Sequence, residues 1–168
     1  MIDDMNPGPY TVALLEDEPG TRQRLTHAIE TDPLALLLWA GASARECMGW
    51  LETHRVDVLL VDLRLPDGSG TDVIRHCRAW QPQCDVMVVT MFADQANMID
   101  AFAAGARGYL LKDGTEEDLA RHVHDLRAGG SPMSPPIARR LLQLWHWGGS
   151  GGGGAGAAGR GLPQVPSM

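Results

Sequence analysis

Acidic, hydroxyl and basic side chains follow four short apolar runs of the sequence, each at the point where the run ends. They are Glu16, Asp17 and Glu18 after the first run, then Asp62, Thr90 and Lys112 after three later ones. Clustered carboxylates repel one another unless a divalent cation neutralises them, and ligands that are all oxygen favour Mg²⁺ over zinc. A lysine ammonium and a threonine hydroxyl can both donate to phosphate oxygens. Together the residues predict a site for Mg²⁺ and a phosphoryl group.

Lys112 is the only lysine among the 14 Lys and Arg residues of the chain. Its ammonium is a compact point charge, whereas the planar guanidinium of arginine needs more room and a bidentate partner. A carboxylate can act as a nucleophile and form an acyl phosphate. Asp62 is the candidate acceptor, because the third strand should lie centrally and the loop "DLRLPDGSG" can fold over a metal. Taken singly, Asp62 could be a turn residue, residues 16–18 the acidic start of a helix, Thr90 a strand residue and Lys112 a surface charge. Their joint occurrence at successive run ends favours the phosphoryl site.

Apolar runs that are typical of buried strands alternate with amphipathic patterns that are typical of helices. We expect strands over residues 10–15, 34–40, 56–61, 85–90 and 107–111. We expect helices over residues 21–30, 44–54, 71–80, 95–104 and 116–128. This alternation predicts an α/β fold with a parallel sheet that helices cover on both faces. Since such folds form their sites at the carboxyl ends of the strands, the residues after the strands should meet at one edge.

The character of the sequence changes after Gly130. Residues 131–136 are rich in proline, and residues 137–147 have the pattern of one further helix. Residues 148–161 are almost entirely glycine and alanine, which predicts a flexible linker. The helix would expose too much apolar surface by itself, so we expect it to cover another part of the chain or a second protomer. Its large apolar residues are Leu141, Leu142, Leu144, Trp145 and Trp147.

Composition bounds the remaining classes of function. The chain has 168 residues and a net charge of −7, which argues against a nucleic-acid surface on these residues. Its three cysteines show no metal-ligand spacing and are expected to be reduced thiols. No signal peptide or stretch long enough to cross a membrane is visible, so we expect a cytoplasmic protein with no membrane partner.

Four stretches of the sequence together resemble the receiver domain of bacterial two-component response regulators. They are "VALLEDEPG", "VDVLLVDLRLPDGSG", "VMVVTMFAD" and "GARGYLLKDG", and they lie within residues 10–128. The resemblance implies a flavodoxin-like, five-stranded parallel sheet in the order 2-1-3-4-5, with five helices on its two faces. It also implies a chain organised as a tail (1–9), a receiver (10–130), a proline-rich break and linker helix (131–147) and a glycine-rich tail (148–168).

The resemblance also implies a role for each residue of the site. Asp62 matches the phosphoacceptor and Lys112 the lysine that contacts the phosphoryl group. Asp17 matches a direct Mg²⁺ ligand and Glu16 one that acts through water, while Arg64 would offer its backbone carbonyl. Thr90 and Tyr109 match the hydroxyl and aromatic switch residues, with Tyr109 expected to turn inward after phosphorylation. Arg64 and Phe92 would flank the route of attacking water.

A sensor histidine kinase is the implied phosphoryl donor, and the receiver is regulatory rather than an enzyme in its own right. Phosphorylation would alter the face formed by about residues 94–128 and favour a homodimer. The stretch "GGSPMSPPIARRLL" resembles the segment that precedes the helix-turn-helix output domain of LuxR-type transcription regulators. We interpret the chain as the N-terminal part of such a regulator, which would contact DNA only through that further domain. The alternative is a stand-alone receiver that acts through protein contacts.

Two other classes of protein fit less well. A haloacid-dehalogenase-type phosphatase would need a second Asp at position 64, where this chain has Arg64. A dinucleotide-binding domain would need Gly-x-Gly-x-x-Gly after the first strand, where this chain has "EDEPG".

Overall fold

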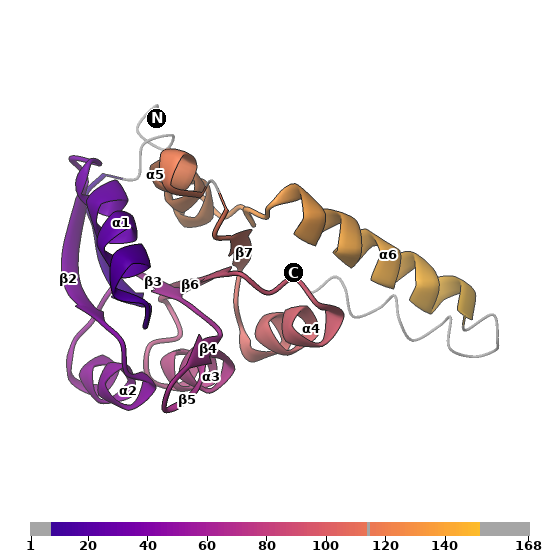
Figure 1. Cartoon of the computed structure of the whole chain (residues 1–168), viewed down its shortest axis with the longest axis horizontal. Coiled ribbons are helices and arrows are strands. Elements are labelled where there is room, and N and C mark those ends of the chain that lie inside the picture. The colour runs from indigo at the N-terminus through magenta and orange to yellow at the C-terminus, as the bar shows by residue number, and fades with distance from the viewer. Residues whose placement is uncertain (1–7, 114, 152–168) are drawn as a thin grey trace. The chain divides into compact units, whose positions relative to one another are not determined.

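The computed structural model describes residues 8–113 and 115–151 (Figure 1). Within these residues the strands are β1 (Tyr10–Leu15), β2 (Ala35–Gly41), β3 (Val58–Val61), β4 (Arg64–Leu65), β5 (Gly68–Ser69), β6 (Asp85–Thr90) and β7 (Gly108–Leu111). The helices are α1 (Pro19–Glu30), α2 (Ala44–Thr53), α3 (Gly70–Trp80), α4 (Gln95–Ala104), α5 (Thr115–Arg127) and α6 (Pro135–Gly151). The predicted alternation of strands and helices is therefore confirmed.

Five strands form one parallel sheet in the order β2-β1-β3-β6-β7. Numbered by their order along the chain, these five strands have the predicted order 2-1-3-4-5. Because β3 pairs with β1 on one side and β6 on the other, the residue that follows it lies at the middle of the sheet edge. The chain adds β2 on one side of β1 and the later strands on the other side, so the strand order reverses between β1 and β3. Parallel α/β folds place their ligands at such a point.

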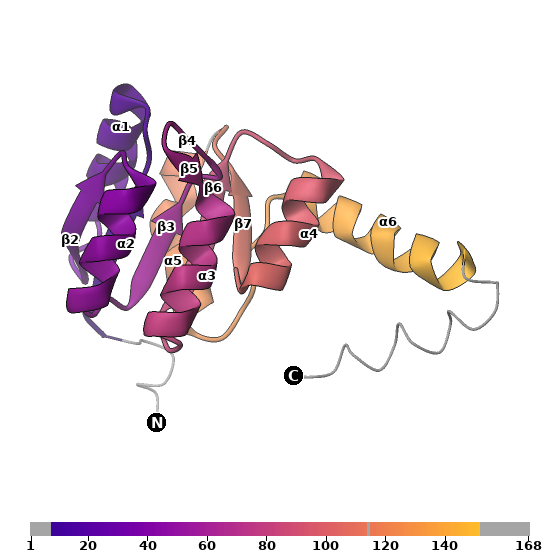
Figure 2. The ribbon, with the colours of Figure 1, turned by 90° about the horizontal axis from the view of Figure 1, so that it is seen from below.

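Helices cover both faces of the sheet, α1 and α5 on one face and α2, α3 and α4 on the other (Figures 1 and 2). The central strands are buried on both sides, and all four residues of β3 are buried. This explains why the strand sequences are continuous apolar runs rather than alternating ones. One core cluster lies under α1 and α5, where Leu25 and Ile29 meet Leu119 and Val123. These packed layers hold the ends of the strands in place.

The structure adds one element that the sequence pattern did not predict. After Asp62 the chain forms a small antiparallel hairpin, in which β4 pairs with β5. Asp67 at its turn accepts hydrogen bonds from Ser43 Oγ and from the backbone N–H groups of Ala44 and Arg45. These bonds tie the hairpin to the start of α2 and lower the pKa of Asp67 to about 2. Strands of two residues are too short to show any periodicity in the sequence.

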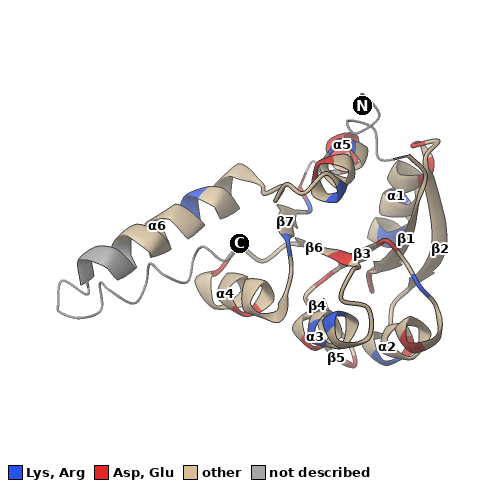
Figure 3. Cartoon of the chain, turned by 180° about the vertical axis from the view of Figure 1, so that it is seen from behind, with Lys and Arg blue, Asp and Glu red and all other residues tan. Residues whose placement is uncertain are grey.

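The chain divides into two compact units, with the division after Ser134. In the second unit, α6 continues through Gly151 instead of ending at the predicted Trp147. Glycine lowers helix propensity by about 1 kcal/mol per residue without forbidding the helix. Leu141, Leu142 and Trp145 are exposed on it, while the Trp147 side chain lies outside the described residues. Figure 3 shows basic but no acidic residues on the described part of α6, whereas α2, α3 and α5 carry both.

Several expectations fall on other parts of the chain. Residues 1–7 and 152–168, which belong to the predicted tails, lie outside the described residues. The three cysteines, Cys47, Cys77 and Cys84, are free and buried, as expected for reduced thiols. None of the helices within residues 8–113 and 115–151 is both long and apolar enough to cross a membrane.

Candidate functional site

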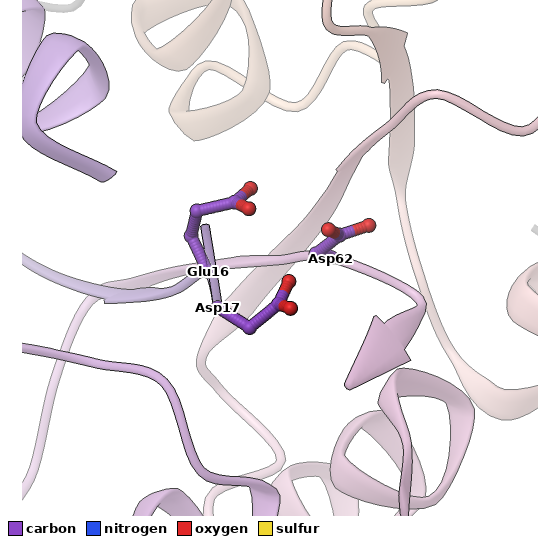
Figure 4. A group of neighbouring side chains, drawn as sticks. All are labelled: Glu16, Asp17 and Asp62. Atoms are coloured by element: carbon purple, nitrogen blue, oxygen red, sulfur yellow. The ribbon is translucent and has the colours of Figure 1, made fainter. Parts of the chain in front are cut away.

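Three carboxylates meet at the carboxyl edge of the parallel sheet (Figure 4). Glu16 and Asp17 follow β1, and Asp62 follows β3. One carboxylate oxygen of each residue lies within 4.8 Å of the corresponding oxygen of the other two. Glu16 and Asp62 are buried, with 1% and 5% of their surface exposed, and Asp17 is half-buried. The structure therefore brings together the residues that the sequence predicted as a cluster.

Glu18 has a different role from the two acidic residues before it. Its carboxylate accepts hydrogen bonds from the backbone N–H groups of Thr21, at 2.6 Å, and Gly20, at 3.2 Å. These bonds make Glu18 the N-cap of α1. Its negative charge there also interacts favourably with the helix dipole and so stabilises the helix. The same hydrogen bonds lower the pKa of the Glu18 carboxyl. Glu16 and Asp17 therefore belong to the carboxylate cluster, whereas Glu18 belongs to the acidic start of a helix.

Lys112 follows β7 and reaches into the carboxylate cluster. Its Nζ donates to Asp62 Oδ2 at 2.8 Å and to Glu16 Oε2 at 3.0 Å. It also lies 2.9 Å from Glu16 Oε1. With 13% of its side chain exposed, the ammonium is largely removed from solvent. The lysine that stood out in the composition is therefore the cation that contacts the predicted phosphoacceptor.

The charges in the cluster are strongly coupled. Burial raises the pKa of Glu16 and the nearby Asp62 carboxylate adds to this rise, while the hydrogen bond from Lys112 opposes it. Burial lowers the pKa of Lys112, but hydrogen bonds to Asp62 and Glu16 outweigh this, so its pKa lies above the usual value. Lys112 therefore stays charged at neutral pH. The raised pKa of Glu16 comes first from its burial, and the neighbouring Asp62 carboxylate adds to it.

The residues present fit a hard divalent cation. The ligand atoms of Glu16, Asp17 and Asp62 are all oxygens, which suits Mg²⁺. Within the described part of the chain, Glu16 Oε1 is buried and accepts no hydrogen bond of good geometry, so it keeps a lone pair for a cation or its water. The backbone carbonyl of Arg64, at the start of β4, stays a predicted ligand.

Gly70 holds the backbone of the predicted acceptor in place, and sequence reasoning missed it. A Cβ atom on Gly70 would lie 2.1 Å from the Asp62 carbonyl oxygen and 2.8 Å from Leu63 Cα. Gly70 N also donates to Leu63 O at 2.9 Å. The start of α3 therefore packs directly against the loop that carries Asp62. The position of a glycine eight residues after Asp62 carries no signal unless this tertiary contact is known.

Replacement of Gly70 by alanine is expected to lower the free energy of unfolding by about 1–3 kcal/mol, because the methyl group overpacks against backbone that cannot move aside. Gly49→Ala is the matched control, since nothing lies within 4 Å of a Cβ at this helical glycine. The control should be stabilised by up to about 1 kcal/mol through helix propensity. Urea unfolding of the two variants measures the difference, and an unchanged midpoint for Gly70→Ala would contradict the close approach.

Arg22 is a second residue that sequence reasoning missed. Its guanidinium donates to the backbone carbonyl of Glu16 at 2.8 Å and to that of Asp17 at 3.4 Å. These bonds run from the first turn of α1 back to the acidic loop. Arg22 therefore fixes the backbone that carries two of the three carboxylates, without adding its charge to the ligand set.

Thr90 and Tyr109 lie on neighbouring strands, and neither is exposed at all. Thr90 Oγ1 accepts from Phe92 N at 3.4 Å, and the Tyr109 hydroxyl donates to Phe92 O at 2.5 Å. Burial raises the pKa of Tyr109, so its hydroxyl remains a donor. The inward position that was expected of Tyr109 only after phosphorylation is the one that the structure shows.

Arg64 and Phe92 contact each other beside the pocket. The Arg64 guanidinium lies 4.0 Å from the centre of the Phe92 ring, in a cation–π arrangement. One residue comes from the hairpin after β3 and the other from the loop after β6. The sequence predicted both as neighbours of the pocket, and their direct contact joins the two loops.

Residues 12–124 match the family model described as the response regulator receiver domain. The chain is 33% identical over 131 residues to the DNA-binding transcriptional activator DevR/DosR of Mycobacterium tuberculosis, covering 78% of this chain and 60% of the relative. It is 26% identical over 132 residues to the nitrate/nitrite response regulator NarL of Escherichia coli, covering 79% of this chain and 61% of the relative. The chain thus spans about 60% of the length of these curated relatives.

Solved structures give the same picture. A two-component response regulator of the LuxR family from Aurantimonas sp. SI85-9A1 is similar with a TM-score of 0.76 and 28% identity, over 82% of this chain and 98% of that one. The receiver domain of RcsB from Salmonella enterica, determined with a phosphomimetic, has a TM-score of 0.72 at 20% identity, over 79% of this chain and 98% of that one. The second likeness supports the fold alone.

Proposed function

The chain belongs to the response regulator receiver domain family, and we propose that Asp62 accepts a phosphoryl group from a sensor histidine kinase. The phosphorylated receiver would then control a DNA-binding output domain that follows it. The observation that supports this function most directly is the contact of Lys112 Nζ with Asp62 Oδ2 at 2.8 Å, inside a carboxylate cluster suited to Mg²⁺. A structural ion pair would not require two further carboxylates at the same place.

The Asp62 carboxylate is oriented for attack by two contacts. Oδ1 accepts from Leu63 N at 2.8 Å, and Oδ2 accepts from Lys112 Nζ. We propose that a carboxylate oxygen bonds to phosphorus as the P–N bond of phosphohistidine breaks, so that the histidine leaves and an acyl phosphate remains. Lys112 then moves from the carboxylate to a phosphoryl oxygen, and Thr90 donates its hydroxyl to another. Bound Mg²⁺, held by Glu16, Asp17, Asp62 and the Arg64 carbonyl, would neutralise charge on the phosphoryl oxygens.

The switch would be a shift of population rather than a new conformation. Tyr109 is already buried with its hydroxyl on Phe92 O, so the chain can adopt the inward arrangement by itself. Each charge-assisted hydrogen bond to the new group contributes about 1.5–3 kcal/mol. Reversing a 99:1 equilibrium needs about 5.5 kcal/mol, which two such bonds reach only at the top of their range. Because Lys112 already donates to the Asp62 carboxylate, its net gain is smaller, and the two bonds supply only part of the shift. We infer that dimerisation or Mg²⁺ supplies the rest.

The partners follow from this mechanism. Met91 lies in the loop before α4 and has 69% of its surface exposed, and Ile99 lies on α4 and has 47% exposed. We propose that the face formed by α4, β7 and α5 pairs with a second copy after phosphorylation.

Residues 10–130 would act as the receiver and residues 131–147 as the connection to a helix-turn-helix domain. Such a regulator would work in the cytoplasm, where kinase and DNA are both accessible.

Acetyl phosphate and Mg²⁺ provide the direct test of phosphorylation. The chain is expected to take up a single phosphoryl group that is lost on mild alkaline treatment, as acyl phosphates are, and uptake should stop when a chelator removes the metal. Intact-mass measurement follows both steps. A chain that remained unmodified under these conditions would contradict the proposed function.

The contact between Arg64 and Phe92 is expected to prolong the life of the acyl phosphate, because the joined pair would flank the route of attacking water and narrow it. Phe92→Ala should shorten the half-life severalfold, and Arg64→Ala should do the same. Because the two residues act as one joined pair, the double variant should lose little more than either single one. Arg75→Ala, which removes an exposed arginine on α3, is the control for lost charge. Additive effects of the two substitutions would show that they act independently.

A further inference from the structure

Residues 132–134, in the segment between α5 and α6, run alongside the outer edge of β7, and we call them the strap. Tyr109 N donates to Pro132 O at 2.9 Å, and Ser134 N donates to Tyr109 O at 3.1 Å. Met133 forms a parallel bridge with Tyr109 between these two bonds. Ser134 Oγ accepts from Leu111 N at 2.8 Å. The strap therefore provides hydrogen-bond partners for the backbone N–H and C=O of Tyr109 and for the backbone N–H of Leu111.

The local sequence explains how the chain returns to β7. Gly129 has φ +100° and Gly130 N donates to Asp125 O at 2.9 Å, which ends α5 and reverses the chain. Gly108 admits the strap, because a Cβ there would lie 3.0 Å from Pro132 O. The turn after α5 and the small residue on β7 thus serve the same contact. Proline and serine in the strap show no strand pattern, so the sequence did not predict it.

The strap pairs with the strand that carries Tyr109 and leads directly into Lys112. Tyr109 is bonded to it through both backbone groups, and Leu111 directly precedes Lys112. On the opposite side, Lys112 N donates to Thr90 O at 2.9 Å. The backbone before Lys112 is therefore fixed between β6 and the strap.

We propose that the strap, through Ser134, positions Lys112 and Tyr109 for the phosphoryl group, and that phosphorylation in turn tightens the strap. This inference rests on the proposed function. A phosphoryl group on Asp62 carries close to two negative charges and would hold Lys112 more firmly than the Asp62 carboxylate does. The segment after β7 would then move less, and the strap paired with β7 would open less often. Coupling between two sites is reciprocal, so a loosened strap must weaken binding at Asp62 by the same factor. Because Ser134 directly precedes Pro135 of α6, the strap is also the covalent route by which this change reaches the following segment.

Substitutions of Ser134 in the full chain separate the hydroxyl contact from packing. Ser134→Val removes the acceptor for Leu111 N, whereas Ser134→Thr keeps it on a side chain of the same shape. Ser131→Val, at an exposed position just before the strap, is the control. Beryllofluoride with Mg²⁺ serves as the phosphoryl analogue, and its dissociation constant is followed by fluorine NMR. We expect Ser134→Val to weaken its binding about fivefold or more, with Ser134→Thr and Ser131→Val close to wild type.

Amide hydrogen exchange measures the reciprocal effect in the wild-type chain. Beryllofluoride should slow exchange at the Tyr109, Leu111 and Ser134 amides about fivefold or more, and this slowing should be lost in Lys112→Met even at saturating analogue. Unchanged exchange at these amides in a wild-type chain that binds the analogue would overturn the strap proposal alone. Equal affinities of Ser134→Val and Ser134→Thr, with both variants folded, would overturn it as well. A wild-type chain that bound no analogue would overturn the proposed function, and the strap proposal with it.

Discussion

Asp62→Asn is expected to reduce uptake of the phosphoryl group from acetyl phosphate to background. The substitution keeps the shape of the side chain and the oxygen that accepts from Leu63 N, but it removes the nucleophilic carboxylate. Lys112 would still donate to Glu16, so the pocket should stay folded with the new side-chain amide in place of the carboxylate. Intact-mass measurement after incubation with acetyl phosphate and Mg²⁺ compares the variant with the wild-type chain.

Asp67→Asn is the matched control for this variant. Asp67 lies in the same loop, but its carboxylate accepts from Ser43, Ala44 and Arg45 and caps α2 rather than facing the cluster. We expect Asp67→Asn to take up the label at close to the wild-type level. Full labelling of Asp62→Asn would place the acceptor on another residue, and loss of label in both variants would point to damage of the loop instead.

The positions of the proposed reactive residues could be predicted because they depend on topology alone. Asp62, Thr90 and Lys112 follow strands of one parallel sheet, and parallel strands bring their carboxyl ends to one edge whatever the packing details. The alternation of apolar runs and amphipathic patterns was enough to predict that sheet. Glu16 and Asp17 were also predicted as members of the cluster, since the pair comes at the end of a buried strand.

The supporting residues could not be predicted because their roles depend on how closely distant segments approach. Gly70 matters through a contact with the Asp62 carbonyl, and Arg22 through bonds to the carbonyls before its own helix. Neither contact leaves a periodic trace in the sequence. The strap at residues 132–134 is three residues long, too short for a strand pattern, and it follows a turn at Gly129 and Gly130 that brings the chain back to β7. The sequence thus predicts which groups come together, and tertiary contacts decide how they are held.

Lys112 connects the chemistry of the pocket to its stability. It is the ammonium that pairs with Asp62 and Glu16, both of which are buried. Arginine in its place would keep the charge but bring a planar fork into a site shaped around a point charge. We expect Lys112→Arg to retain phosphorylation and to dimerise less on activation, which sedimentation velocity would measure. Dimerisation of this variant at the wild-type level would contradict the role of Lys112 in the switch.

Lys112→Met is expected to lower the free energy of unfolding by about 3 kcal/mol in the absence of added Mg²⁺, because it leaves buried carboxylates without their cation. Arg107→Met is the matched control, since it breaks an ion pair with Asp85 in which 53% of the arginine side chain is exposed. The control should cost about 1 kcal/mol or less. Urea unfolding of both variants, with and without Mg²⁺, measures the difference.

The response to Mg²⁺ and to a second substitution identifies the source of this loss. A cation that binds the native carboxylates stabilises the folded chain by mass action, so Mg²⁺ should recover more stability in Lys112→Met than it adds to the wild type. Adding Asp62→Asn to Lys112→Met should also restore part of the loss, since it removes one of the unpaired charges, and the two effects should be far from additive. If neither Mg²⁺ nor Asp62→Asn restored stability, the loss would come from the packing of the lysine stem, and the electrostatic account of the pocket would be wrong.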